Sequence, residues 1–374
     1  MVAVIGWAMA AWLAARLFAA NPPAAGFDLE LLLRAGREVA AGRSPYDPAL
    51  LAGTAPDATG LFFSYPPLVA QAFAVVSFVP SGVAFVAWSI GAVAALLAVT
   101  ERIRRTVRAK APTGTVALAV LAVASLTFPF TIAVLFGNID AFFPALYGLA
   151  LVAAVSPLRS AGIAGGLAVA IAAVTKLYPA GLGLWFAVRA LRDRPAAVTV
   201  AVAVAAAAVL VAVSFVVGGF DPWRDYLTVA GAASRAELLD PDNIGPAALL
   251  ANILGRDSDF ARLIQVAVTL AAVAAIVGAA WKVRDPVESL AIAATATFVL
   301  LPVTWIHYPA ALIPFAAAAL LRSDGQAAAR TRLLIGGAVV VAGASLAWLP
   351  LLWVAIGLAL AGIHSSAANR EAAT

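Results

Sequence analysis

The sequence has no cysteine and only two histidines, His307 and His364. The lack of cysteine excludes disulfides, a thiolate nucleophile and cysteine-ligated metals, and two histidines leave little scope for a metal site built from imidazoles. Charged residues make up 11% of the chain, against about 25% in soluble globular domains. Glycine-rich phosphate loops, Ser-His-Asp arrangements and zinc-ligand spacings are missing too. Such a low fraction of charged residues indicates a membrane protein.

Hydrophobic residues dominate what is there, at 64% of the chain. Apolar stretches of about 17 to 25 residues, the length that crosses a bilayer as a helix, recur along nearly the whole sequence. Backbone groups in lipid must be satisfied internally, so such stretches form helices. We therefore expect an all-α, polytopic membrane protein with a single domain, residues 1–374. Residues 1–20 lack a basic start, and we read them as a retained first helix, the alternative being a signal peptide cleaved near Ala20.

Lysine and arginine concentrate in four joints between apolar stretches: 101–110, 189–195, 281–285 and 322–332. Cytoplasmic loops carry an excess of these residues, which predicts that all four joints, and both termini, lie in the cytoplasm. Two long polar loops, 21–64 and 219–260, then lie on the outer face. The first loop contains a helix whose apolar face we expect to include Leu29, Leu32, Leu33, Ala35 and Gly36.

One apolar segment, 65–80, does not fit this alternation, since its crossing would move the basic joint at 101–110 to the outside. It is short, begins at Pro66-Pro67 and ends at Pro80. Apolar segments of about 10 to 14 residues are more often re-entrant or interfacial than spanning. We predict a re-entrant or juxtamembrane half-helix here and about twelve crossings in the rest of the chain, counted from stretches of spanning length.

Polar residues near helix ends gather on the predicted outer face. Asp28 follows the first apolar segment, where a carboxylate could act as a general base or simply cap a helix. Lys176 ends an apolar run in "TKLYP", where it could bind a phosphate or extend towards the lipid headgroups. His307 in "TWIHYP" could bind a leaving phosphate or belong to an aromatic belt.

Two further motifs have both a structural and a functional interpretation. "LFGNIDAFFP" places Asn138 and Asp140 at a tight turn on the outer face, where Asp140 could be a capping residue or part of a site. Asp240-Pro-Asp242 superficially resembles a metal-binding Asp-x-Asp, but proline and aspartate together are typical of turns, and we favour a turn.

Taken in order, these motifs resemble glycosyltransferase family 87, the polyprenyl-phosphate-mannose-dependent transferases of the GT-C superfamily. The resemblance rests on "FDLELLLRAGREVAAGRSPYD", "FFSYPPL", "FGNID", "TKLYP" and "WIHYP", and it extends from residue 1 to about residue 320. The first block is the most specific. The chain departs from the family at "FGNID", where members often have Gly-Gln-x-Asn, and "DNIGPAALL" matches the family's Asn-x-Ser segment only loosely.

The resemblance implies a GT-C type bundle that transfers a sugar, mannose first among them, from a polyprenyl-phosphate donor to a hydroxyl of a lipid-linked or glycan acceptor. It implies an inverting reaction on the outer face of the cytoplasmic membrane, with Asp28 as the general base. Lys176 and His307 would approach the donor phosphate. With a lysine to stabilise the leaving phosphate, we expect no metal and no cofactor. Further residues that the resemblance places at the substrate are Tyr65, Asn138, Asp140, Tyr178 and Asn243.

Two other classes of membrane protein remain open at this point. A transporter or a flippase for a lipid-linked sugar would place charges near the bilayer midplane and often has repeated halves, whereas the charges here lie at one face and no repeat is obvious. A membrane acyltransferase would need a more central histidine.

Overall fold

The computed structural model describes residues 25–52, 62–323 and 325–372. At residues 325–327 it describes the backbone only. These residues form helices joined by turns, with one isolated bridge between Asn243 and Trp305. The all-α prediction is therefore confirmed for this part of the chain. The predicted first helix, 1–20, and the middle of the first outer loop, 53–61, lie outside the described residues.

Five helices in the described ranges are long and apolar enough to cross a membrane. They are α5 (Ser81–Thr106), α11 (Arg194–Gly218), α14 (Ser258–Lys282), α17 (Gly325–Ala344) and α18 (Leu351–Glu371). A sixth span is possible if α6 (Thr113–Leu126) and α7 (Phe128–Phe136), which meet at an angle of 81°, act together. The chain is a multi-pass membrane protein, but the predicted number of about twelve crossings is not confirmed.

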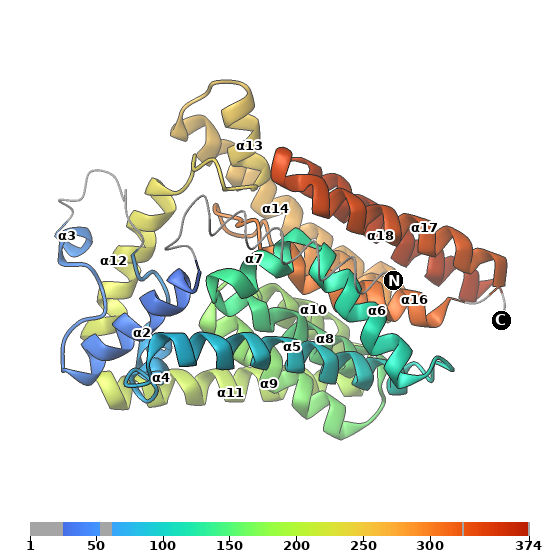
Figure 1. Cartoon of the computed structure of the whole chain (residues 1–374), viewed down its shortest axis with the longest axis horizontal. Coiled ribbons are helices and arrows are strands. Elements are labelled where there is room, and N and C mark those ends of the chain that lie inside the picture. Colours follow the sequence, from blue (N-terminus) through green and yellow to red (C-terminus); the bar gives the residue numbers. More distant parts are fainter. Residues whose placement is uncertain (1–24, 53–61, 324, 373–374) are drawn as a thin grey trace.

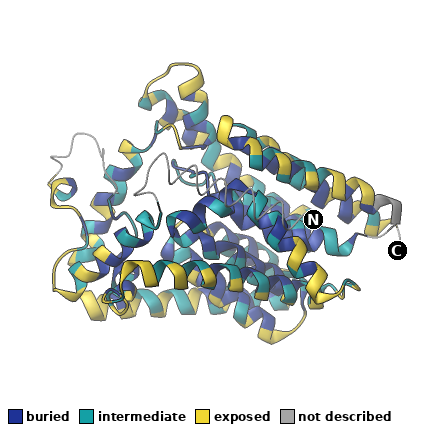
Figure 2. Ribbon diagram, viewed as in Figure 1, coloured by how far each residue is buried: buried dark blue, intermediate teal, exposed yellow. Residues whose placement is uncertain are grey.

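Shorter helices form the interior of the bundle. They are η2 (Ile139–Phe142), α8 (Phe143–Val155), α9 (Arg159–Thr175), α10 (Ala180–Ala190), α15 (Pro286–Thr297), η3 (Tyr308–Leu312) and α16 (Ile313–Arg322), while η4 (Ser345–Ala347), between α17 and α18, is largely exposed. Figure 2 shows the buried residues gathered among these helices, while α5 and α11 turn exposed residues outward. The exposed side chains on α11 include Val204, Val209 and Val213, so this outer surface suits contact with lipid.

Small residues and internal hydrogen bonds hold the interior helices together, as expected where lipid replaces water. A methyl group on Gly166 of α9 would lie 2.6 Å from the carbonyl oxygen of Thr199, so glycine permits the close approach of α9 to α11. Buried Trp185 donates its indole N–H to Oγ of Ser289 over 2.9 Å. α10 and α15 are thereby joined by a polar contact as well as by packing.

Short helices cover one end of the bundle, at the left of Figure 1. They are α2 (Phe27–Ala40), α3 (Pro48–Leu51), α4 (Pro67–Ala74) and α12 (Asp221–Ala236), with α13 (Pro246–Ile253) nearby in sequence. The predicted apolar face of α2 is buried, including Leu29, Leu32 and Leu33. α4 is the only helix in the 65–80 segment, and its 8 residues span about 12 Å at 1.5 Å per residue, too little to cross a bilayer.

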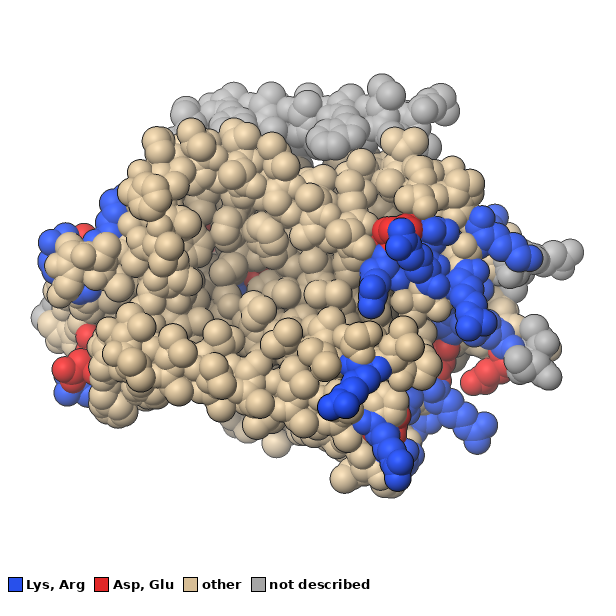
Figure 3. All heavy atoms as spheres, turned by 90° about the horizontal axis from the view of Figure 1, so that it is seen from below, with Lys and Arg blue, Asp and Glu red and all other residues tan. Residues whose placement is uncertain are grey.

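Lysine and arginine gather at the opposite end of the molecule, on the right in Figure 3. Some of these side chains also close helix ends. Arg189 donates to the carbonyl oxygens of Ala280 and Val283, and Arg192 donates to that of Trp281, all near the C-terminus of α14. Cations there neutralise the negative end of the helix dipole. The two ends of the bundle therefore differ in charge as the sequence indicated.

Candidate active site

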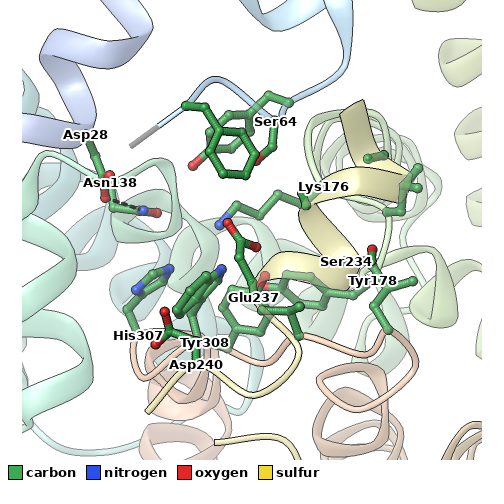
Figure 4. Close-up of a pocket in the computed structure, with 18 of the residues that line it drawn as sticks. Asp28, Ser64, Asn138, Lys176, Tyr178, Ser234, Glu237, Asp240, His307 and Tyr308 are labelled. Atoms are coloured by element: carbon green, nitrogen blue, oxygen red, sulfur yellow. Dashed lines mark hydrogen bonds between the residues drawn. The ribbon is translucent and has the colours of Figure 1, made fainter. Parts of the chain in front are cut away.

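A pocket of about 420 Å³ opens beneath the short helices α2 and α12. Figure 4 shows that its polar side chains come from segments far apart in the sequence. These segments are the first turn of α2, residues 62–66, the end of α7 with the turn after it, the joint between α9 and α10, one face of α12, and residues 301–308. The outer joints singled out in the sequence therefore meet at one place.

Asp28 lies in the first turn of α2 and lines this pocket. The helix begins at Phe27 and its N-cap is Gly26, so Asp28 is not the capping residue. Instead, Oδ2 of Asp28 accepts a hydrogen bond of 2.6 Å from Nδ2 of Asn138. Burial raises the pKa of the Asp28 carboxyl, while the hydrogen bond from Asn138 and the charges of His307 and Lys176 oppose this shift. A carboxylate with a raised pKa is a stronger base.

Two glycines bring α2 against the turn that carries Asn138. Gly26 has φ 69° and donates its N–H to the carbonyl oxygen of Leu135 over 2.9 Å. Gly137 has φ 66°, a conformation that side chains with a Cβ disfavour. A methyl group at Gly137 would also lie 2.7 Å from Cβ of Leu29. Glycine at 137 is thus required both for the turn and for the contact between Asp28 and Asn138.

The sequence left open whether Asp140 caps a helix, but the residue that caps η2 is Asn138. Its Oδ1 accepts from the backbone N–H of Asp140 over 2.9 Å, which starts η2, and its Nδ2 holds Asp28. The side chain is 4% exposed and lines the pocket. The turn "GNID" is therefore a structural turn that also orients the candidate base.

Lys176 is the first residue after α9, and its Nζ lies 2.8 Å from Oδ2 of Asp140. Nε2 of His307 lies 2.8 Å from the same oxygen. The three side chains are 11%, 1% and 8% exposed for Lys176, Asp140 and His307. One buried carboxylate thus lies between a lysine and a histidine, and a lysine held in this way is not extended towards the headgroups.

Aromatic rings complete the surroundings of Lys176. Its Nζ lies 4.9 Å from the ring centroid of Tyr308 and 5.4 Å from that of Tyr65. Tyr178 stacks on Tyr308 with ring centroids 4.3 Å apart. A cation between aromatic faces gains attraction from the ring quadrupoles. Tyr65 and Tyr178 both line the pocket, Tyr65 near Lys176 and Tyr178 against Tyr308.

Six of the eight residues predicted from the sequence line the pocket: Asp28, Tyr65, Asn138, Lys176, Tyr178 and His307. Asp140 is not among the residues that line the pocket; its carboxylate lies beside Lys176 and His307, so its geometry favours orienting these two side chains.

Asn243 is fully buried and away from the pocket lining. Its amide donates to the carbonyl oxygens of Leu238 and Pro302, and accepts from the N–H groups of Gly245 and Thr304. Asn243 joins two loops, and its geometry favours this structural role over direct contact with substrate.

The pocket is also lined by Ser234 and Glu237, which no sequence motif indicated, and by Asp240, for which the sequence favoured a turn. Burial, helped by the charge of Asp240, raises the pKa of the Glu237 carboxyl to about 7, and Lys176 opposes this shift. Asp240 accepts from the N–H of Asp242 over 2.7 Å, which is the predicted turn. Spacing along α12 is the signal that could have identified Glu237, since Tyr226, Ala230, Ala233 and Glu237 fall on one helical face.

Both the family model and the known protein that match this sequence are glycosyltransferases. The family model for glycosyltransferase family 87 matches residues 62–306. A polyprenol-phosphate-mannose-dependent alpha-(1-2)-phosphatidylinositol pentamannoside mannosyltransferase of Mycolicibacterium smegmatis is 29% identical over 265 residues, which cover 67% of this chain. The chain spans 59% of the length of that relative. The range matched by the family model contains Asn138 and Lys176 but not Asp28 or His307.

Proposed function

Because the chain belongs to glycosyltransferase family 87, we propose that it transfers a sugar from a polyprenyl-phosphate donor to a hydroxyl of a lipid-linked or glycan acceptor. Mannose is the first sugar to test, since the M. smegmatis relative is named as polyprenol-phosphate-mannose-dependent. The observation that carries the proposal is that a carboxylate with a raised pKa and two side chains able to bind a phosphate, Lys176 and His307, line the same pocket.

Asp28 is the proposed general base. It accepts the proton of the acceptor hydroxyl as the oxygen attacks the anomeric carbon, and the bond from that carbon to the phosphate oxygen breaks. Attack from the face opposite the phosphate inverts the anomeric centre. The hydrogen bond from Asn138 fixes the orientation of the carboxylate, and a positioned base contributes about 10² to 10⁴ in rate.

Lys176 and His307 are the proposed phosphate-binding pair. The donor is a phosphodiester with one negative charge, and the departing polyprenyl phosphate gains a second as it takes the bonding electrons. Cations placed where charge grows stabilise the transition state more than the ground state. One oxygen of Asp140 accepts a hydrogen bond from Lys176 and lies 2.8 Å from Nε2 of His307, so Asp140 orients the lysine in the absence of donor and partly neutralises it.

Apolar residues of the pocket suit a lipid-linked donor. Phe27, Leu31, Phe62, Leu177 and Ile306 line it beside the polar groups. Figure 3 shows a hollow in the apolar surface with a few charged atoms inside it. A donor anchored by its prenyl chain is delivered from the bilayer, so the enzyme needs no nucleotide-binding domain.

We place the pocket on the extracytoplasmic face of the cytoplasmic membrane. Residues of α2 and α12 line the pocket; these helices lie at the left of Figure 1, and most lysines and arginines lie at the other end of the molecule, on the right of Figure 3. Basic joints mark the cytoplasmic side in most membrane proteins. This orientation supposes a donor that has already been flipped to the outer leaflet.

The test is incubation of membranes that contain the protein with radiolabelled polyprenyl-phosphate-mannose. We expect label in a new glycolipid or glycan, separable from the donor by chromatography. Phosphatidylinositol mannosides are the first acceptors to add, because the relative's name includes one. A flippase would move labelled donor between leaflets with no new product, and that result would contradict the proposal.

A further inference from the structure

One face of α12, a helix of the second outer loop, forms a wall of the pocket. Tyr226, Ala230, Ala233, Ser234 and Glu237 line it, spaced by three or four residues apart from the adjacent pair Ala233 and Ser234. This spacing places them on one side of a helix. The two alanines leave room beside the helix, and Ser234 and Glu237 add polar groups at its last turn. α12 therefore provides space together with hydrogen-bonding groups.

Glu237 is held by its backbone while its carboxyl remains available. Its N–H donates to the carbonyl oxygen of Ala233 over 2.9 Å, and its own carbonyl oxygen accepts from the N–H of Asp240 over 3.2 Å and from Nδ2 of Asn243 over 3.3 Å. Among residues 25–52, 62–323 and 325–372, none forms a hydrogen bond or an ion pair with the carboxyl of Glu237. The carboxyl is therefore free to accept hydrogen bonds from a ligand in the pocket that it lines.

The position of Glu237 restricts what that ligand group can be. Figure 4 shows its carboxyl beside Lys176 and above Tyr308. A phosphate held by Lys176 carries negative charge, so it repels the carboxylate of Glu237 and is not its direct partner. The sugar is bonded directly to that phosphate and carries several hydroxyl groups, which donate strong hydrogen bonds to a carboxylate.

We propose that Glu237 and Ser234 bind hydroxyl groups of the transferred sugar and set which sugar the enzyme accepts. This inference rests on the proposed function, and it assigns the sugar end of the donor to the wall formed by α12. A site built to hydrogen-bond a hydroxyl discriminates strongly against ligands that lack it, because its polar groups are then left unpaired.

The experiment compares two lipids, polyprenyl-phosphate-mannose and bare polyprenyl phosphate, on the purified protein in detergent. The dissociation constant of polyprenyl phosphate divided by that of polyprenyl-phosphate-mannose, measured by tryptophan fluorescence, isolates the contribution of the sugar. We expect Glu237→Ala to reduce this ratio by about tenfold, the equivalent of one good hydrogen bond or about 1.4 kcal/mol, with the affinity for polyprenyl phosphate unchanged. Lys176→Met should instead weaken the binding of both lipids. Asp221→Asn, at an exposed carboxylate in the first turn of the same helix, is the matched control and should change neither.

Each other outcome has a defined meaning. An unchanged ratio in Glu237→Ala, with the protein folded as judged by its melting temperature, overturns the sugar-binding role. Loss of turnover in Glu237→Gln with donor binding and selectivity intact would make Glu237 a base and would also overturn it. Where the alanine variant fails to fold, Glu237→Gln is the deciding variant. We then expect it to bind mannosyl and glucosyl donors with equal affinity. Failure of the wild-type protein to bind either lipid removes the proposed function, and this inference with it.

Discussion

Replacing Asp140 by asparagine tests the buried ion pair behind the pocket. Asp140 is 1% exposed and lies 2.8 Å from both Lys176 and His307. At an effective dielectric constant of about 20, unit charges at that distance attract by about 6 kcal/mol before desolvation is counted. Removing one partner of a buried pair costs about 3 to 5 kcal/mol, because the other charge is left uncompensated. We therefore expect Asp140→Asn to lower the free energy of unfolding by about 3 kcal/mol and to reduce transfer.

A double variant separates the ion pair from the loss of Asp140 itself. In Asp140→Asn combined with Lys176→Met, no lysine is left unpaired, so stability should return towards that of the wild type while transfer stays low. Unfolding is followed by tryptophan fluorescence in detergent, and transfer by labelled donor. The control is Asp259→Asn, which breaks an exposed pair with Arg262 and should cost less than about 1 kcal/mol. Equal destabilisation in the single and the double variant would refute the reasoning.

Three further predictions concern the turn, the titration and the orientation. Gly137→Ala should lower the free energy of unfolding by about 1 to 3 kcal/mol, since residue 137 has positive φ and its Cβ would meet Leu29. The rate of transfer should also fall, by more than the loss of folded protein explains. Full activity would show that the contact of Asp28 with Asn138 is dispensable. Glu237 is neutral below its pKa of about 7 and ionised above it, with Lys176, Asp240 and Tyr308 around it; the ionised carboxyl accepts stronger hydrogen bonds from the sugar hydroxyls. The preference for polyprenyl-phosphate-mannose over polyprenyl phosphate should therefore increase as pH rises through about 7, and an increase of the same size in Glu237→Gln would exclude this cause. A cysteine at position 109, in the basic joint after α5, should resist an impermeant thiol reagent added outside intact cells, and labelling there would reverse the proposed orientation.

The class of fold could be predicted from the sequence because it depends on the fraction of charged residues and the length of the apolar stretches, which are read directly from the sequence. Scarce charge and long apolar stretches require helices in lipid, and the apolar face of α2 follows from its spacing. The number of crossings was harder to predict. α9 and α10 are broken at Lys176 to Pro179, and α6 and α7 meet at an angle of 81°. Apolar content alone does not distinguish such broken elements from full spans.

The candidate site was predictable in part for a similar reason. Asp28, Asn138, Lys176 and His307 are polar residues at the ends of apolar runs, where polarity is costly unless it has a use. Asp140 was assigned to the substrate because its burial behind Lys176 depends on tertiary packing. Asn243 resembles a substrate contact in the sequence, yet backbone groups of two loops occupy its amide. Glu237 lies in a polar loop where a carboxylate is ordinary, and only the fold reveals that it faces a pocket.

Transfer by the Asp28→Asn protein is the most direct test of the central claim, that Asp28 acts as a base on a sugar held through a lipid-linked phosphate. Asparagine can still accept the hydrogen bond from Asn138, and the helix is capped at Gly26, so the protein should fold with an unchanged melting temperature and bind polyprenyl-phosphate-mannose as the wild type does. It cannot accept a proton, and we expect transfer from the labelled donor to fall at least about a hundredfold. Transfer within about threefold of the wild type, far less than a positioned base contributes, would contradict the account.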